Sequence, residues 1–263
     1  MKILKIYARH NTPQQNYEIC YGVWDAIEGD SDSIDSFSAD LDSYDIVFLP
    51  MYSRWEGHLD LLNRIKDHKI KTVLFDDDSC YRSFGDEFYD GIDYIFHRGP
   101  DKDGVLPLTG SVLLWSINHL TYTPVYGGSG VSFLGSVCSA YPLRVEIDRF
   151  IKHSLLPTGE YIKTLQNSAA SIHTNSVLFS SARGKVLEFA ACGAQIISNR
   201  CDNMHNYFPD ELIVYFDTVD QLRDIVNGFE PDVTIQKISR SIVEAKHTHE
   251  IRAEEIIEKL YRI

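Results

Sequence analysis

Residues 180–198 read SSARGKVLEFAACGAQIIS, and this stretch decides the fold expected around it. A serine-rich loop containing Gly184 opens a helix expected over residues 184–191. Gly193 ends that helix directly before an apolar strand expected over residues 195–198. Small residues near the end of the helix allow it to approach a sheet closely. A helix followed by a buried strand is part of a βαβ unit, from which parallel α/β sheets are built.

The start of this helix has the chemistry of an anion site. Backbone N–H groups at a helix N-terminus attract anions, and the helix dipole adds to that attraction. Arg183 and Lys185 add two cations at the same end. Glu188 lies one turn further in, where a carboxylate accepts hydrogen bonds from vicinal hydroxyls such as those of a ribose. The residues alone leave a second interpretation open, an ordinary helix with Gly193 as its C-cap and a solvated Glu188.

The same alternation of apolar runs and helical patterns extends in both directions along the chain. In the first half, strands are expected over residues 3–8, 45–51, 72–76, 94–97 and 112–116, and a helix over residues 58–68. Residues 28–42 are rich in Asp and Ser and are expected to form a solvated loop or an edge. In the second half, strands are expected over residues 131–135, 170–173, 195–198 and 212–216, and helices over residues 143–152, 160–169, 184–191, 220–228, 234–246 and 250–260.

A cluster of helix and strand breakers, PVYGGSG at residues 124–130, separates the two halves and is the best linker candidate. The sequence therefore predicts two α/β domains in series, over residues 1–125 and 126–263. The chain has 263 residues, of which 44% are hydrophobic and 24% charged, as in an ordinary globular protein. This length suits one large domain or two small ones.

Several classes of protein are disfavoured by composition. No apolar run approaches the roughly 20 residues that span a bilayer. The chain turns polar by Arg9, too early for the apolar core of a signal peptide, so a cytosolic protein is expected. The five cysteines are scattered without a Cys-x-x-Cys pair, which argues against a disulfide framework and against a zinc ribbon.

The net charge of −13 is unevenly distributed. Residues 1–125 carry 11 Lys and Arg against 21 Asp and Glu, a balance of −10, and residues 126–263 carry 14 against 17, a balance of −3. Because phosphate contacts need Lys and Arg, nucleic acid is disfavoured as a general partner. A small anionic ligand can still bind the less acidic second half through a local cluster of cations.

The pattern basic-x-Leu-Glu-Phe-Ala-Ala-Cys-Gly-Ala-x-Ile-Ile at residues 185–197 resembles the donor-binding segment of GT-B glycosyltransferases. The nearest group is the "glycosyl transferases group 1" domain of CgeB-like proteins. Further segments resemble the same group, namely VSFLGS at 131–136 followed by Arg144, EYIKTL at 160–165, ASIHTN at 170–175, residues 212–216 and 219–222, and the tail HTHEIR at 247–252. The likeness covers roughly residues 130–263 and is weak over residues 1–125.

This resemblance implies a GT-B-like α/β fold, with two Rossmann-type domains facing across a cleft and a terminal helix that packs back on the first domain. It implies a glycosyltransferase that moves a sugar, without a metal, from a nucleotide-sugar donor to an unidentified acceptor. The donor expected first is a UDP-sugar, and no permanently bound cofactor is expected. The acceptor is a glycan, a small molecule or, less in keeping with the charge, modified DNA.

The resemblance also implies a set of donor-binding residues. These are Gly135, Ser136, Arg144, His173, Asn175, Arg183, Gly184, Lys185 and Glu188. Glu188 matches the glutamate that binds the nucleotide ribose, and the basic residues and the helix start face the diphosphate. His173 and Asn175 either bind donor hydroxyls or are satisfied polar groups at a strand end. Many relatives have a second glutamate eight residues earlier that contacts the donor sugar; here that position is Ser180, so recognition of the sugar does not carry over.

Two residues of the first half are candidates for the catalytic base. His10 follows the first expected strand and either deprotonates an acceptor hydroxyl or is a surface histidine. Asp76, Asp77 and Asp78 lie at the end of the third expected strand and suggest a metal site or the Asp-x-Asp of GT-A enzymes. GT-B enzymes stabilise the leaving group with a helix end and basic residues instead. The expected role is therefore structural or acceptor-lining, with Asp77 as a candidate general base.

Three other functions remain open from the sequence. A protein that binds nucleotide sugars without catalysis would explain the weak likeness of the first half and Ser180. A GT-B-fold epimerase would convert a sugar nucleotide with no acceptor present. A phage-type transferase acting on modified DNA bases is a narrower form of the main hypothesis, against which the acidic first half counts.

Overall fold

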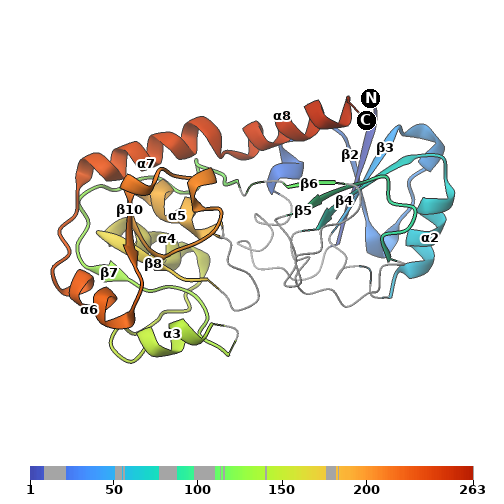
Figure 1. The fold of residues 1–263 in the computed structure, drawn as a ribbon. Coiled ribbons are helices and arrows are strands. Elements are labelled where there is room, and N and C mark those ends of the chain that lie inside the picture. Colours follow the sequence, from blue (N-terminus) through green and yellow to red (C-terminus); the bar gives the residue numbers. More distant parts are fainter. Residues whose placement is uncertain are drawn as a thin grey trace. The chain divides into compact units, whose positions relative to one another are not determined.

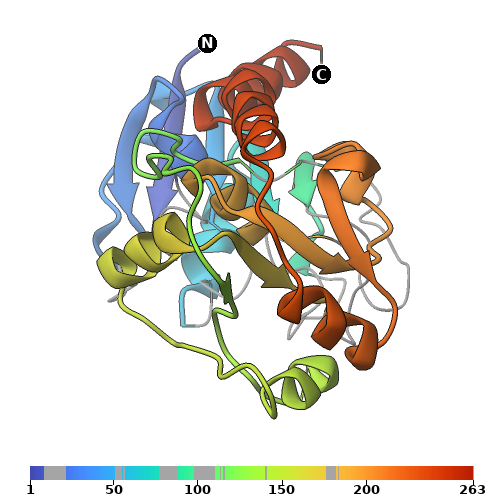
Figure 2. The ribbon, with the colours of Figure 1, turned by 90° about the vertical axis from the view of Figure 1, so that its left-hand side faces the viewer.

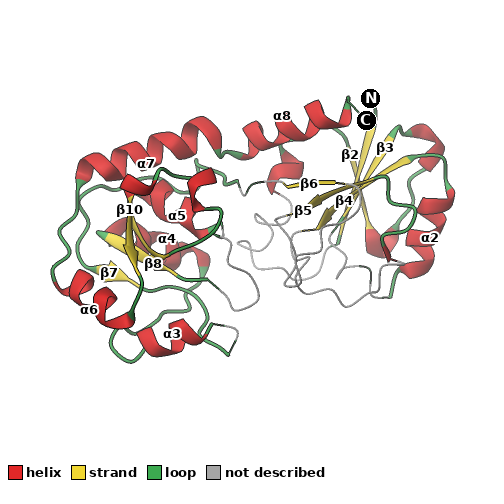
Figure 3. Cartoon of the chain, viewed as in Figure 1, coloured by secondary structure: helices red, strands yellow, loops and turns green. Residues whose placement is uncertain are grey.

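The structure is a computed structural model of the 263-residue chain. It describes residues 1–8, 22–50, 55, 57–76, 88–97, 110–112, 114, 116–139, 141–175, 182 and 184–262. The chain forms two compact units, Met1–Leu114 together with Ala253–Ile263 (unit 1), and Trp115–Arg252 (unit 2). Each unit contains a parallel sheet and α-helices (Figure 3). Within the described ranges, no helix has the length and apolar character needed to cross a membrane.

Unit 1 contains a parallel sheet of six strands (Figure 1). The strands are β1 (Ile3–Tyr7), β2 (Asp30–Ser33), β3 (Ile46–Leu49), β4 (Lys71–Asp76), β5 (Tyr94–His97) and β6 (Gly110–Val112). They lie in the order β2-β1-β3-β4-β5-β6, with Leu4 opposite Val47 in the register of β1 and β3. The direction of winding reverses between β1 and β3, as in doubly wound folds that bind ligands at such a point.

Both faces of this sheet are buried, because successive residues of a strand point to opposite faces. One face carries Leu4, Ile6, Val47, Leu49, Leu74 and Ile95 and is covered by Leu62 and Ile65 of α2 (Leu59–Asp67). The other carries Ile3, Ile46, Phe48, Val73, Phe75 and Phe96, which pack with Trp24 and with Ala253, Ile256 and Leu260 of α8 (His249–Leu260). The last helix of the chain therefore completes the core that the first strands begin.

Four of the strands expected in the first half are confirmed to within two residues at each end, and the fifth is wrong. The strand expected over residues 112–116 lies at Gly110–Val112 instead. The Asp- and Ser-rich segment 28–42 contributes β2 to the edge of the sheet, the edge alternative of the expectation. There the Asp32 carboxylate accepts hydrogen bonds from the backbone N–H groups of Ser33, Ser38 and Ala39 at 2.7–2.8 Å, which ends the strand.

Unit 2 contains a parallel sheet of four strands in the order β10-β9-β8-β7. The strands are β7 (Val131–Ser132), β8 (Ala170–His173), β9 (Gln195–Asn199) and β10 (Ile213–Phe216), and the helices are α3 (Pro142–Ile147), α4 (Thr158–Asn167), α5 (Lys185–Cys192), α6 (Val219–Asn227) and α7 (Val233–Lys246). Ile172 of β8 lies opposite Ile197 of β9. Apolar residues of α3 and α6 pack on one face of the sheet, and α5 contacts β8 and β9 between α4 and α7 (Figures 1 and 2).

Two expected elements of unit 2 are shorter than their patterns suggest. The strand expected over residues 131–135 ends at Ser132, because Leu134 pairs with Ser154 in an isolated bridge and Gly135 has a φ of +102°. The helix expected over residues 143–152 ends at Ile147 and continues only as turns. The other strands and helices of this half are confirmed to within two residues at each end.

Helix α5 is the most buried helix segment of unit 2. All seven residues from Val186 to Cys192 are buried. Gly193 caps the helix with a φ of +87°, and a Cβ there would lie 2.5 Å from the carbonyl oxygen of Val125. Glycine is therefore required both by the left-handed backbone and by the close approach of the chain. Its expected role as a C-cap is confirmed.

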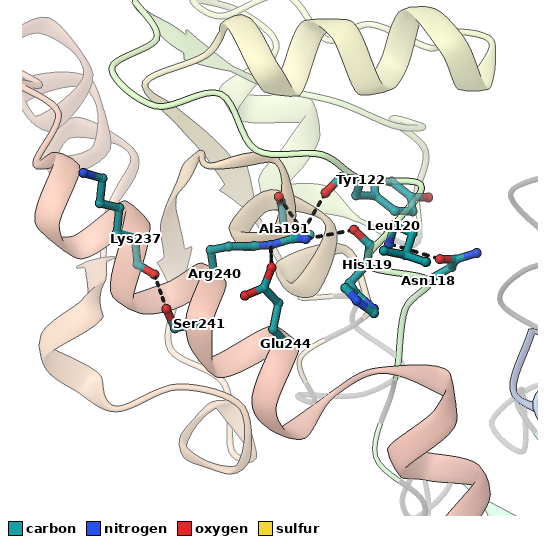
Figure 4. A network of polar contacts seen from close by, with 9 residues as sticks. All are labelled: Asn118, His119, Leu120, Tyr122, Ala191, Lys237, Arg240, Ser241 and Glu244. Atoms are coloured by element: carbon teal, nitrogen blue, oxygen red, sulfur yellow. Dashed lines mark hydrogen bonds and ion pairs between the residues drawn. The ribbon is translucent and has the colours of Figure 1, made fainter.

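Arg240 of α7 forms hydrogen bonds both with the segment around Tyr122, near the start of unit 2, and with the end of α5 (Figure 4). Its guanidinium donates hydrogen bonds to the carbonyl oxygens of Tyr122 and Ala191, and to that of His119 at 2.9 Å. Its Nε donates to Glu244 one turn along α7 at 2.8 Å. A single buried side chain thus satisfies carbonyl groups from two separate segments, one of them at the C-terminus of α5, where cations are favourable.

Candidate functional site

The candidate site lies at the carboxyl ends of the strands in unit 2, where ligands of open α/β sheets bind. Gly135 lies just after β7. His173 is the last residue of β8, and Asn175 lies two positions beyond it. Helix α5 begins at Lys185. The residue before α5, Gly184, has no side chain to cap the first turn of the helix. The N-terminus of α5 carries the positive end of the helix dipole, and Gly184 adds no carboxylate or hydroxyl there to cap it.

Two cations meet beside Gly135. The guanidinium of Arg144 in α3 donates a hydrogen bond to the carbonyl oxygen of Leu134, and the Nζ of Lys185 lies 3.4 Å from the same oxygen. A Cβ on Gly135 would overlap this Nζ and would lie 3.4 Å from the guanidinium nitrogens of Arg144. Glycine therefore provides the space in which two side chains from different helices converge.

The electrostatics of this pair indicate a site for an anion. Arg144 is 5% exposed, and within the described part of the chain its Nε has no hydrogen-bond partner. Among the residues that the structure describes, no carboxylate lies within ion-pair distance of Arg144 or Lys185. Burial lowers the pKa of Arg144, and burial together with the charge of Arg144 lowers the pKa of Lys185 to about 8, against the opposing effect of Glu188. Two positive charges held together with so little neighbouring negative charge favour the binding of a negatively charged group.

Glu188 is 6% exposed, so the alternative of a solvated glutamate is wrong. Its Oε2 accepts a hydrogen bond from the hydroxyl of Tyr161, which is buried in the first turns of α4. Burial and the nearby carboxylate raise the pKa of Tyr161 well above its usual value, so the hydroxyl keeps its proton and donates. Sequence reasoning missed Tyr161: its spacing from Leu165 indicates a buried helix face but says nothing about the partner of its hydroxyl.

His173 and Asn175 have partners inside the protein. The Nδ1 of His173 lies 3.0 Å from the hydroxyl oxygen of Ser198 on the neighbouring strand. The Nδ2 of Asn175 donates to the carbonyl oxygen of Arg200 at 2.9 Å, and its Oδ1 accepts from the thiol of Cys201 at 2.9 Å. These contacts agree with the second interpretation given above, in which both residues are satisfied polar groups at a strand end. Contact of either residue with a donor stays a prediction.

The remaining predicted site residues fall into two groups. Ser136 follows Gly135 in the chain and is exposed, and the N–H of Gly135 donates to the carbonyl oxygen of Ser154 at 2.9 Å. Gly135 thus contributes space to the site rather than a hydrogen-bond donor. Three predicted residues lie outside the residues that the structure describes: His10, Asp77 and Arg183.

Comparison with known proteins gives a family match over the second half of the chain. The family model described as glycosyl transferase-like matches residues 124–258, which include every described residue of the candidate site. A search of curated protein sequences gives no significant match.

Several solved structures resemble the whole chain. HepE from Anabaena, in complex with UDP-glucose, is 10% identical over 100% of both chains, with a TM-score of 0.68. A glycosyltransferase from Rickettsia africae is 10% identical over 98% of this chain and 97% of the other, with a TM-score of 0.63. The DNA-modifying enzyme β-glucosyltransferase, studied with and without uridine diphosphoglucose, is 13% identical over 100% of both chains, with a TM-score of 0.62.

Proposed function

The chain belongs to the glycosyl transferase-like family, and from this premise we propose that unit 2 binds the diphosphate of a nucleotide-sugar donor at Arg144, Lys185 and the start of α5. The protein is a glycosyltransferase with a GT-B-like α/β fold. The family and the fold define the type of reaction, and the residues of this chain suggest how the donor is held.

The observation that carries the proposal is the convergence of two cations on one carbonyl oxygen without a carboxylate partner in the described part of the chain. When the bond between the sugar and the diphosphate breaks, negative charge accumulates on the departing nucleotide. Cations already held in place stabilise that charge without reorganising during the reaction. The N-terminus of α5 adds its dipole to the same end. We propose that these groups stabilise the leaving diphosphate without a bound metal.

Glu188 is proposed to bind the ribose of the donor. An ionised carboxylate only accepts hydrogen bonds, and its two oxygens match the two hydroxyls of a vicinal diol. Glu188 lies three positions after Lys185, about one turn further into α5, so we propose that it receives the ribose of a donor whose diphosphate binds at the start of the helix. The solved complexes of HepE contain UDP and UDP-glucose, which supports a UDP-sugar as the donor to test first.

The acceptor is proposed to be an uncharged hydroxyl compound, such as a glycan or a small molecule. Residues 1–125, which include most of unit 1, have a charge balance of −10. Such a surface repels a polyanion, which makes DNA the weaker candidate despite the structural likeness to a DNA-modifying enzyme. His10 and Asp77 remain proposed candidates for the base that activates the acceptor.

A thermal-shift screen with UDP-, GDP-, ADP- and CMP-sugars tests the proposal. We expect one class, UDP-sugars first, to raise the melting temperature, and we expect Lys185→Ala and Glu188→Ala to lose that shift. Lys237→Ala removes the same charge from an exposed position on α7 and serves as the matched control. If no nucleotide sugar binds the wild type, or if Lys185→Ala retains the full shift, the proposed donor site is wrong.

Release of UDP separates catalysis from binding alone. A pure binding protein gives a thermal shift but releases no UDP from UDP-glucose, with or without candidate acceptors. An epimerase converts the donor in the absence of an acceptor. Release of UDP that depends on an added acceptor supports sugar transfer.

A further inference from the structure

We propose that Tyr161 is a positioning residue, which holds the carboxylate of Glu188 in the orientation that receives the ribose hydroxyls of the donor. This inference rests on the proposed function and deepens it, because it assigns a role to a residue of α4 that makes no proposed contact with the donor. The observation behind it is the hydrogen bond from the Tyr161 hydroxyl to Oε2 of Glu188.

The two side chains come from different helices and meet inside the unit. Tyr161 lies in α4 and Glu188 in α5, 27 positions later in the chain, and the two helices contact each other. Both residues are buried. Leu165, one turn after Tyr161, is buried as well, so α4 is fixed against its neighbours by apolar packing. The hydroxyl is therefore held at a defined position rather than on a mobile surface.

A glutamate needs such a partner if it is to bind a diol reproducibly. Its side chain has three rotatable bonds, and a fixed hydrogen bond to one oxygen restricts them before the ligand arrives. The donated hydrogen bond also favours the ionised carboxylate, which accepts hydrogen bonds with both oxygens. A protonated glutamate would turn one acceptor into a donor and would match the ribose less well.

The ionisation of the neighbouring groups is consistent with this role. Burial and the negative charge of Glu188 raise the pKa of Tyr161 well above its usual value, so the hydroxyl remains a donor throughout the neutral range. Lys185 lies on the same helix, and the negative charge of Glu188 raises the pKa of Lys185 against the larger lowering by burial and by Arg144.

The alternative is that the hydrogen bond only joins α4 to α5. Phenylalanine keeps the ring and its packing, so Tyr161→Phe removes the hydroxyl with little change in shape. A purely structural role predicts a lower unfolding midpoint and equal losses of affinity for every nucleotide. A positioning role predicts a loss that depends on the ribose hydroxyls.

Isothermal titration of wild type and Tyr161→Phe with UDP, 2′-deoxy-UDP and 3′-deoxy-UDP distinguishes these roles. We expect Tyr161→Phe to weaken the binding of UDP by about fivefold to tenfold, which corresponds to the net contribution of one ordinary hydrogen bond. We expect a change of less than about twofold for at least one deoxy analogue, because the hydroxyl that Tyr161 serves is absent there. With UDP-glucose as donor, KM should rise by a similar factor while kcat stays within about twofold.

Two further variants complete the test. Tyr215→Phe removes a tyrosine–carboxylate hydrogen bond elsewhere in unit 2, the 2.8 Å bond to Asp210, and should leave the affinity for UDP unchanged. In a Glu188→Ala background, Tyr161→Phe should cause no further loss of affinity for UDP, because the side chain that it positions is gone. Circular dichroism and urea unfolding confirm that each variant is folded.

Failure of the inference and failure of the proposed function give different results. If the wild type binds no nucleotide, the proposed donor site is wrong and Tyr161 has no such role. If the wild type binds UDP but Tyr161→Phe binds all three nucleotides as the wild type does, or loses the same factor for each, only the positioning role is overturned.

Discussion

The Nζ of Lys185 lies 3.4 Å from the carbonyl oxygen of Leu134, although 51 positions separate the two residues in the chain. The guanidinium of Arg144 donates to the same oxygen. The two cations therefore share one carbonyl oxygen, and neither cation has a carboxylate partner among the residues that the structure describes. This arrangement keeps positive charge available to a ligand, and it makes the charge of Lys185 sensitive to pH.

Donor binding is predicted to weaken as the pH rises through about 8. The pKa of Lys185 is lowered to about 8 by burial and by Arg144. A bound diphosphate stabilises the protonated lysine and raises this pKa, so binding takes up a proton at pH values between the free and the bound pKa. In that range the affinity for UDP-glucose should fall by up to about tenfold for each pH unit.

Titration calorimetry at pH 7 and pH 8.5, in buffers of different ionisation enthalpy, measures both the affinity and the proton uptake. UDP-glucose is the suitable ligand because its diphosphate diester does not itself titrate in this range. Lys185→Arg keeps the charge and should remove the pH dependence. Equal affinity of the wild type at both pH values would contradict the prediction.

A second prediction concerns Gly135 and uses Gly193 as its control. Both glycines have a positive φ, +102° and +87°, so alanine at either position should destabilise the protein by about 1–3 kcal/mol. Only a Cβ at Gly135 would displace Lys185 and press on Arg144. Gly135→Ala should therefore also weaken the binding of UDP by about tenfold, whereas folded Gly193→Ala should bind UDP as the wild type does. Urea unfolding and titration calorimetry measure the two effects separately.

Arg240 is predicted to contribute strongly to the stability of unit 2. Arg240→Met leaves the carbonyl groups of His119, Tyr122 and Ala191 without this donor. The loss should lower the free energy of unfolding by about 3 kcal/mol, as expected when one member of a buried charged network is removed. Arg223→Met removes an exposed ion pair with Asp220 and should cost less than about 0.5 kcal/mol. Similar unfolding midpoints for the two variants would show that the network in Figure 4 contributes little.

Reactivity of the cysteines gives a test of burial in unit 2. Burial raises the pKa of Cys192 to about 12 and that of Cys201 to about 11, so both thiols stay protonated near pH 8. Cys138 is exposed. Among these three, iodoacetamide should modify Cys138 first, and it should reach the other two only in denaturant. Peptide mapping by mass spectrometry measures the order, and early modification of Cys192 would show that α5 is less protected than its packing indicates.

Local patterns were sufficient for the elements that form the centre of unit 2. The strand β8 has the expected bounds, Ala170–His173, because a short run of small and apolar residues bounded by polar ones suits a strand buried on both faces. The end of α5 was also predictable, since Gly193 follows the last apolar position of the helix. Each of these signals lies within a few residues of the feature that it determines.

Expected elements were less accurate where distant segments set the boundary. The strand expected over residues 131–135 ends at Ser132, because Leu134 pairs with Ser154 twenty positions later rather than with the sheet. The expected edge at residues 28–42 is present, but its strand forms by pairing with β1, where Asp30 lies opposite Leu4 from an earlier segment of the chain. No pattern within either segment contains that information.

The sequence alone determined which residues of the second half carry charge and where α5 starts and ends. Helix periodicity and the glycines next to the ends of a helix are local properties of the chain. Only the tertiary structure decided that Arg144 and Lys185 share the carbonyl of Leu134, and that the hydroxyl of Tyr161 meets Glu188. Those contacts join residues on different helices, and their geometry depends on how the helices pack against the sheet and against each other. Packing is a property of the whole unit, so side chains separated by 27 or 51 positions acquire their partners only when the unit is folded.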